Sequence, residues 1–176
     1  MPNGETDKLS VSFCYICCSL RDYFYFMDKQ VCDHQLFMGE AFKEALKAYD
    51  KGEIPVGVVV VIGGRVVARA HNQTETLNDP TAHAEMLAIT SATNTFGGKY
   101  IDKATVYVTL EPCPMCAAAL NWAQVKCVVF GASDPKRGYS LYTPSLLHPR
   151  CDVIAGVMEE ESSELVRQFF KSIRGK

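Results

Sequence analysis

Two short segments thirty residues apart carry the residue types of an open zinc site. The first contains His83 and Glu85, and the second contains Cys113 and Cys116 as a Cys-x-x-Cys pair. Structural zinc sites have four nitrogen or sulfur ligands from the protein, whereas catalytic sites have three protein ligands and one water. His83, Cys113 and Cys116 supply three ligands. Glu85 then remains as a carboxylate beside the metal.

A free carboxylate next to an open zinc site predicts a hydrolytic reaction. Such a site lowers the pKa of a bound water to about 7 and so supplies a nucleophile at neutral pH. Glu85 can take a proton from this water, deliver it to a ring nitrogen of a heteroaromatic amine, and then protonate the departing ammonia. The four residues therefore predict hydrolytic deamination, which requires no organic cofactor.

The other cysteines leave one alternative for the metal, a closed structural site. Cys127 could close a structural zinc site as a fourth ligand, although its place in a predicted strand favours a buried thiol. Cys151 is also expected to be an ordinary core or surface thiol. The pair Cys14 and Cys17 has no histidine and no second cysteine pair nearby, so we expect it to bind no metal.

The elements that position these residues follow from hydrophobic periodicity and turn signals. A Gly63-Gly64 pair predicts a hairpin between the first two strands. The resulting order, α-β-β-α-β-α-β-β-α, predicts an α/β fold in which helices cover both faces of a mixed five-stranded sheet. Trp122 is expected in the core, with a role at an interface as the alternative. Strands are predicted at 56–62, 65–70, 105–109, 126–130 and 153–154, and helices at 33–51, 81–93, 115–122 and 159–173.

The predicted helices place the zinc-site residues at helix N-termini. His83 and Glu85 are two residues apart, and such residues do not share a face in the middle of a helix. They can converge only near the first turn, and Thr81 is the predicted N-cap. Cys113 and Cys116 lie at the start of the next helix, where the partial positive charge of the helix end stabilises thiolates.

Composition restricts the class of protein further. The 176 residues are 48% hydrophobic with a net charge of −2, which is typical of one domain with a substantial core. No general excess of basic residues indicates nucleic-acid binding, but segment 165–176 has four basic residues and no acidic one. No apolar run approaches the roughly 20 residues of a membrane span. Residues 1–32 differ in pattern and are interpreted as an extension, with Met27 as a candidate start, before a domain at 33–176.

Several motifs carry a resemblance to a known family. Together they resemble the bacterial tRNA-specific adenosine deaminases, within the zinc-dependent cytidine and deoxycytidylate deaminase superfamily, whose signature is His-x-Glu followed by Pro-Cys-x-x-Cys. The resemblance extends from about Asp33 to Lys171. The motifs are Ile54-Pro55-Val56-Gly57, His71-Asn72, Asp79-Pro80-Thr81-Ala82-His83-Ala84-Glu85, Tyr107-Val108-Thr109-Leu110-Glu111-Pro112-Cys113 and Val129-Phe130-Gly131-Ala132.

The resemblance implies a cytidine-deaminase-like three-layer α-β-α fold and a specific reaction. The substrate would be the wobble adenosine of a tRNA anticodon, converted to inosine by a cytoplasmic homodimer with one Zn²⁺ per subunit. No membrane and no DNA partner is expected. Asn72 would bind the flipped-out nucleoside. Contacts to the anticodon loop are implied for Asp134 and Lys136 in one segment, and for Phe169, Phe170 and Lys171 in the C-terminal helix.

Other functions remain compatible with the same zinc motif. The main alternative is a deaminase of free guanine or cytosine, or of a nucleotide, from the same superfamily. The zinc motif is common to these enzymes and does not distinguish them. An inactive zinc module that only binds RNA or a partner is disfavoured by Glu85, because such a module gains nothing from an unliganded carboxylate beside the metal.

Overall fold

The computed structural model describes residues 33–142 and 146–175. The chain divides into two compact units, Met1–His34 and Gln35–Lys176, and the second contains the sheet and the predicted zinc site. Cys14 and Cys17 lie outside the described residues. The elements are a helix at 33–50, β1 (Gly57–Ile62), β2 (Arg65–His71), α2 (Ala84–Phe96), β3 (Thr105–Leu110), α3 (Pro114–Trp122), β4 (Cys127–Ala132), the short 3₁₀ helix η1 (Tyr139–Leu141), β5 (Asp152–Ala155) and α4 (Glu159–Arg174).

The five strands form one mixed sheet in the order β2-β1-β3-β4-β5. Strand β1 pairs antiparallel with both β2 and β3, while β3, β4 and β5 run parallel. The β1–β2 hairpin turns at Gly63 and Gly64, which both have positive φ, as a tight hairpin turn of this kind requires. Because β3 and β4 are parallel, the segments that follow them leave the sheet at the same edge. This edge carries the cysteine motif and the segment after Ala132.

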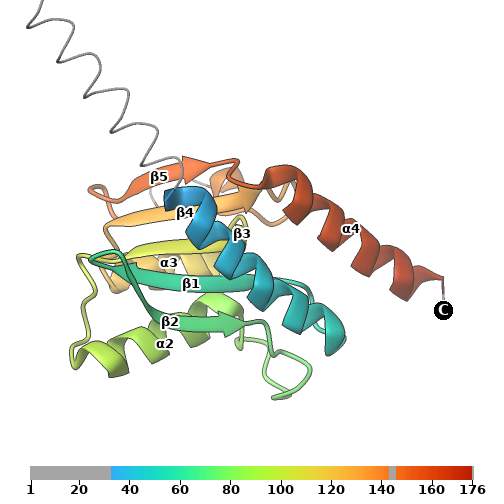
Figure 1. Ribbon diagram of the computed structural model, residues 1–176, viewed down its shortest axis with the longest axis horizontal. Coiled ribbons are helices and arrows are strands. Elements are labelled where there is room, and N and C mark those ends of the chain that lie inside the picture. Colours follow the sequence, from blue (N-terminus) through green and yellow to red (C-terminus); the bar gives the residue numbers. More distant parts are fainter. Residues whose placement is uncertain (1–32, 143–145, 176) are drawn as a thin grey trace, which may run out of the picture. The chain divides into compact units, whose positions relative to one another are not determined.

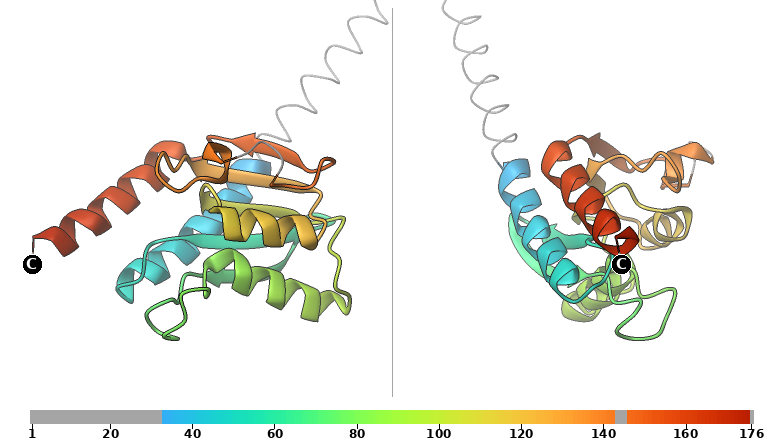
Figure 2. Two further views of the ribbon diagram at one scale, coloured as in Figure 1. Left: turned by 180° about the vertical axis from the view of Figure 1, so that it is seen from behind. Right: turned by 90° about the vertical axis from the view of Figure 1, so that its right-hand side faces the viewer.

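Helices cover both faces of the sheet (Figure 1). The two further views place α2 and α3 on one face and α4 on the other, beside residues 35–50 (Figure 2). Side chains alternate accordingly along β1: Val58 and Val60 join the core cluster with α2 and α3, whereas Val59 and Val61 join the cluster with Met38. The predicted three-layer α-β-α fold is confirmed.

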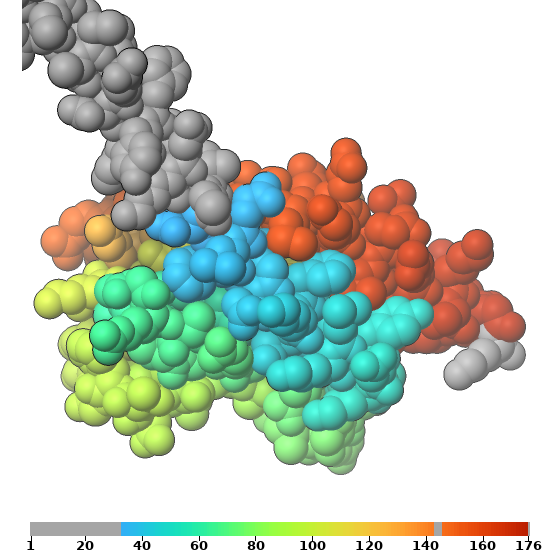
Figure 3. Space-filling model, in the orientation of Figure 1, coloured from blue at the N-terminus to red at the C-terminus, as the bar shows by residue number. Residues whose placement is uncertain are grey.

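Close packing fixes the helix of residues 35–50 against β1. A Cβ added to Gly57 would overlap the backbone of Ala41 and Ala45, so this approach requires glycine. The rings of Tyr49 and Phe169 meet edge to face with their centroids 6.0 Å apart. In the space-filling view, residues 35–50 and α4 accordingly lie side by side (Figure 3). These contacts hold residues 35–50 against β1 and α4 on this face of the sheet.

The predicted elements agree with the structure to within about two residues at most ends, with two corrections. Helix α2 begins at Ala84 with His83 as N-cap, so Thr81 is not the cap. Trp122 is 82% exposed at the end of α3, so its prediction as a core residue is wrong. Cys127 is buried in β4 among the residues facing Met38, as predicted for a core thiol. Among the described residues, no helix has both the length and the apolar character to cross a membrane.

Candidate functional site

Two helix N-termini meet at the predicted zinc site. His83 is the N-cap of α2 and Cys113 is the N-cap of α3, and both have extended backbone angles. Pro114 follows Cys113 at the start of α3, where its fixed φ suits a helix and its missing N–H would have no partner. Just before His83, Asp79 accepts hydrogen bonds from the amide and hydroxyl of Thr81. Thr81 therefore shapes the turn that leads to the helix.

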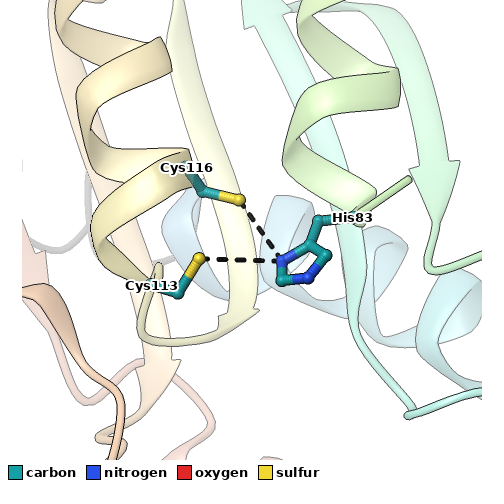
Figure 4. A group of neighbouring side chains, drawn as sticks. All are labelled: His83, Cys113 and Cys116. Atoms are coloured by element: carbon teal, nitrogen blue, oxygen red, sulfur yellow. Dashed lines mark hydrogen bonds between the residues drawn. The ribbon is translucent and has the colours of Figure 1, made fainter. Parts of the chain in front are cut away.

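The three predicted metal ligands converge on one point (Figure 4). His83 Nδ1 lies 3.5 Å from the sulfur of Cys116 and 3.7 Å from the sulfur of Cys113. All three candidate ligand atoms lie within 4.8 Å of one another. Among the described residues, this is the only group of histidine, cysteine or acidic side chains that could hold a metal ion. Cys127 is not part of it.

The spacing of these atoms fits zinc. A nitrogen and a sulfur bound tetrahedrally at about 2.0–2.1 Å and about 2.3 Å are separated by about 3.6 Å. The two observed nitrogen–sulfur distances lie on either side of this value. One imidazole and two thiols are also the donor types that zinc prefers. Three protein ligands leave a fourth position available, as in catalytic zinc sites.

The two cysteines differ in pKa in the metal-free protein. A hydrogen bond from the Cys116 thiol lowers the pKa of Cys113 far below its usual value, and His83 lowers it further. The same bond and burial raise the pKa of Cys116. A metal ligand must be deprotonated, so zinc binding is expected to release the Cys116 proton.

Glu85 lies in the first turn of α2 and is 4% exposed. Burial raises the pKa of its carboxyl group to about 7, and the thiol groups beside it also influence this value. A carboxyl group with a pKa near the working pH can both accept and donate a proton. The structure thus places a titratable carboxyl group close to the candidate metal ligands and outside the candidate metal group.

An open cleft of about 1400 Å³ leads to these residues. Asn72 lines the cleft and is 4% exposed. Its side-chain amide donates hydrogen bonds to the hydroxyl of Thr74 at 3.1 Å and to a carboxylate oxygen of Glu53 at 3.4 Å. These contacts fix the direction of the Asn72 side chain, whose carbonyl oxygen remains available to a bound molecule.

Glu53 is a fully buried carboxylate that organises this side of the cleft. It accepts hydrogen bonds from the backbone amides of Glu75 and Thr76, at 3.2 and 2.7 Å, and from the hydroxyl of Thr74 at 3.2 Å. Burial acts to raise the pKa of Glu53, but the hydrogen bonds together outweigh it and hold the pKa below its ordinary value. A buried charge satisfied in this way fixes the loop after β2.

We expect Glu53→Gln to destabilise the protein by about 2 kcal/mol, because the buried side chain would then place an NH₂ group against a backbone N–H donor of Glu75 or Thr76. Urea unfolding measures this change. The matched control is Glu40→Gln, since Glu40 makes ion pairs with Lys43 and Arg69 at the surface. Surface pairs contribute little, so the control should change stability much less. Equal effects in the two variants would contradict the role given to Glu53.

The segment after β4 forms the opposite side of the cleft. Asp134 and Lys136 both line the cleft, as does Arg137. One carboxylate oxygen of Asp134 accepts hydrogen bonds from the backbone amides of Lys136 and Arg137, at 2.9 and 3.0 Å. Asp134 therefore shapes its own loop, while the side chains of Lys136 and Arg137 are exposed beside the cleft.

One face of α4 continues the cleft beyond this loop. Phe170 and Lys171 line it together with Arg167 and Arg174. Phe169 is 5% exposed and packs against Tyr49, so the structure places its ring away from the cleft lining. Phe169 also meets Phe170 edge to face at 5.5 Å and so supports it from behind.

Family comparison gives the site its chemical class. Residues 31–132, more than half of the chain, match the family described as the cytidine and deoxycytidylate deaminase zinc-binding region. The chain belongs to this family. His83, Glu85, Cys113 and Cys116 all lie within the matched residues. The protein is therefore a zinc-dependent deaminase, in agreement with the donor types and spacing of its cleft.

Proteins similar to this deaminase include tRNA adenosine deaminases and a guanine deaminase. A tRNA-specific adenosine deaminase from Bacillus subtilis (strain 168) is 48% identical over 147 residues, covering 81% of this chain and 91% of that protein. A solved structure from work on A-to-I editing by tRNA:A34 deaminases at the wobble position is 43% identical, with a TM-score of 0.69 over 73% of this chain and 97% of that chain. A guanine deaminase from Bacillus subtilis is 30% identical, with a TM-score of 0.56 over 81% and 94%.

Proposed function

We propose that this deaminase converts the wobble adenosine of a tRNA anticodon to inosine. The observation that carries the proposal is a single cleft that joins the candidate zinc site to basic side chains from two separate segments. A free base needs only an enclosed pocket around the reacting ring, whereas an RNA loop needs contacts to phosphates and to unpaired bases. The high identity to tRNA-specific adenosine deaminases supports the same substrate.

His83, Cys113 and Cys116 hold the zinc ion in this proposal. When bound there, zinc supplies water activated for nucleophilic attack at neutral pH. Glu85 would accept one proton from the attacking water and deliver it to a ring nitrogen of the adenine. It would then take the second proton from the hydroxyl group now bonded to the ring carbon and pass it to the amino group, which leaves as ammonia. Because Glu85 is buried beside the ligands, the same carboxyl group serves both steps without exchanging with bulk solvent.

Asn72 and Phe170 are proposed to hold the nucleoside and its neighbours. Asn72 is oriented by Glu53 and Thr74, so its carbonyl oxygen can accept a hydrogen bond from a nucleoside that has left the base stack. Phe170 is 39% exposed on the cleft wall and offers an aromatic face on which an unpaired base can stack. Asp134, Lys136 and Lys171 complete the proposed contacts, and Phe169 contributes by supporting Phe170.

The basic face of α4 is proposed to bind RNA phosphates. Changing Arg167, Lys171 and Arg174 together to glutamine should weaken stem-loop binding and flatten the dependence of log K on log salt by about 2, since single-stranded contacts contribute about 0.7 per phosphate. Binding titrations at several salt concentrations measure both effects. Substitution is preferable to deleting 165–176, because Leu165 and Phe169 are buried and the deletion would remove part of the core.

A matched triple variant controls for the loss of positive charge. Arg65, Lys99 and Lys103 are exposed and do not line the cleft. Their joint change to glutamine alters the net charge by the same amount but should leave the salt dependence almost unchanged. If the two triple variants lose affinity equally, the proposed phosphate contacts along α4 are wrong.

Further properties are proposed with this function. The working unit is the domain at 33–176, which acts as a cytoplasmic homodimer with one Zn²⁺ per subunit and without a DNA or membrane partner. Both the dimer and the location rest on the relationship to tRNA-specific adenosine deaminases. Sedimentation of the zinc-loaded protein measures the oligomeric state.

Product analysis of a stem-loop tests the function. The zinc-loaded protein is incubated with an anticodon stem-loop that has adenosine at the wobble position, and nuclease digestion with mass spectrometry then locates inosine. The control stem-loop has guanosine at the wobble position and adenosine elsewhere in the loop. We expect inosine in the first RNA alone. Inosine in neither RNA, together with deamination of free guanine, would support the alternative that is suggested by the guanine deaminase relative.

A further inference from the structure

A buried carboxylate outside the zinc site holds one wall of the cleft. Glu111 follows β3 and is 5% exposed. Its two carboxylate oxygens accept hydrogen bonds from the two ends of the 133–140 loop: Oε2 from the amide of Asp134 at 3.0 Å, and Oε1 from the amide of Ser140 at 3.1 Å. One side chain therefore ties together both ends of the loop that carries Lys136 and Arg137.

Backbone contacts place Glu111 at the junction between this loop and the zinc site. The amide of Glu111 donates to the carbonyl of Ala132 at 2.8 Å, at the end of β4. Two residues later the same chain provides Cys113, and the carbonyl between them, of Pro112, accepts a hydrogen bond from the amide of Tyr139 at 2.9 Å. The position of the loop is thus fixed relative to the segment that carries a candidate metal ligand.

The Glu111 carboxylate packs directly against Gly138. A Cβ added to Gly138 would overlap all three atoms of the Glu111 carboxylate group. The φ of Gly138 is −57°, which any residue can adopt, so the space and not the backbone angle requires glycine here. Within the loop, the amide of Gly138 donates to the carbonyl of Asp134 at 2.9 Å. The loop is therefore wrapped around the carboxylate.

We propose that Glu111 is a positioning residue that sets the distance between the deamination centre and the basic tip of the 133–140 loop, and thereby governs RNA affinity. This inference rests on the proposed function for its effect on RNA. Charge-assisted hydrogen bonds from backbone amides to a buried carboxylate are strong and directional, so they hold the loop in one place before RNA binds. A loop held in advance loses less conformational entropy on binding. Glu111 does not contact the reacting atoms in this account.

Two variants disturb the contact from opposite sides. Glu111→Gln keeps the shape of the side chain but places an NH₂ donor against a backbone N–H donor. Gly138→Ala adds a methyl group that displaces the Glu111 carboxylate. In each variant KM for the anticodon stem-loop should rise about tenfold, as for the loss of one charge-assisted hydrogen bond, while kcat stays within about threefold. The KM of the double variant should be no higher than the higher of the two single-variant values, because both substitutions act through one contact. Zinc content should stay at wild-type level.

Hydrogen exchange gives a measurement that does not depend on catalysis. Amide exchange in peptides covering 133–141 should be about tenfold faster in both variants, while peptides from β1 and α2 keep wild-type rates. Gly39→Ala is the matched glycine control, since a Cβ at Gly39 meets nothing within 4 Å, and it should change neither measurement. If the proposed function is wrong, the wild-type protein will not deaminate the stem-loop. The hydrogen-exchange result does not depend on that function and should still be observed.

Three results would overturn the assignment. Unchanged exchange at 133–141 in both variants would show that the carboxylate does not hold the loop. An equal increase in exchange throughout the chain would show a general role in stability. If both variants still deaminate the stem-loop and their KM equals that of the wild type, the position of the loop does not govern RNA affinity.

Discussion

Replacing Glu85 with alanine is expected to lower turnover by about 10²- to 10⁴-fold while one zinc ion per subunit stays bound. The three candidate ligands are untouched by this change, but the proton carrier is lost. Single-turnover kinetics with the stem-loop and metal analysis of the same sample measure the two effects. Because Glu85 is a buried carboxylate whose pKa is raised by burial, its removal should not lower the free energy of unfolding.

The isosteric variant Glu85→Gln separates proton transfer from shape. Glutamine fills the same volume beside the ligands but neither accepts nor donates a proton as a carboxyl group does. Its turnover should fall as far as that of the alanine variant. If Glu85→Gln retains a rate near that of the wild type, or if Glu85→Ala loses its zinc, the role given to Glu85 is wrong.

Removing zinc is expected to abolish turnover. The metal contributes several kcal/mol of transition-state stabilisation, which corresponds to about a thousandfold or more in rate. Dialysis against a chelator followed by the stem-loop assay tests this, and added Zn²⁺ should restore the rate whereas Mg²⁺ should not, because a site with two sulfur donors does not suit a hard cation. The sheet should survive, since its two core clusters do not depend on the metal.

Cysteine substitutions show whether the loss of turnover on zinc removal comes from this site. Cys116→Ser should reproduce the loss of zinc and turnover, because Cys116 is buried with its sulfur 3.5 Å from His83 Nδ1. Cys151→Ser is the matched control, since the thiol of Cys151 lies outside the candidate metal group and donates a hydrogen bond to the carbonyl of Asp152. Retention of full zinc and activity by Cys116→Ser would contradict the ligand assignment.

Much of the fold could be predicted because its signals are local. The β-branched run before Gly63 and Gly64 predicts β1 and the hairpin, and both glycines have the positive φ that the turn needs. Trp122 could not be placed in this way. Its position depends on where α3 ends relative to the surface, and hydrophobic character alone suggested the core, whereas 82% of the residue is exposed.

The candidate site was predictable only in part. His83, Cys113 and Cys116 have a spacing that few other sites share, and the structure brings their ligand atoms together. Glu53 and Glu111 were missed as functional residues because their burial depends on loops folding back from distant parts of the chain. One signal was available: Glu53 directly precedes the recognised motif at 54–57 and Glu111 lies within the motif at 107–113, where a solvated charge is not expected.

Substrate preference tests the central claim most directly. The catalytic efficiency kcat/KM of the zinc-loaded protein should be compared, by ammonia release, for a stem-loop with wobble adenosine and for free guanine, cytosine and adenosine. We predict rapid deamination of the stem-loop to inosine and a far lower efficiency for each free compound. Efficient release of ammonia from a free base, with none from the stem-loop, would contradict the account.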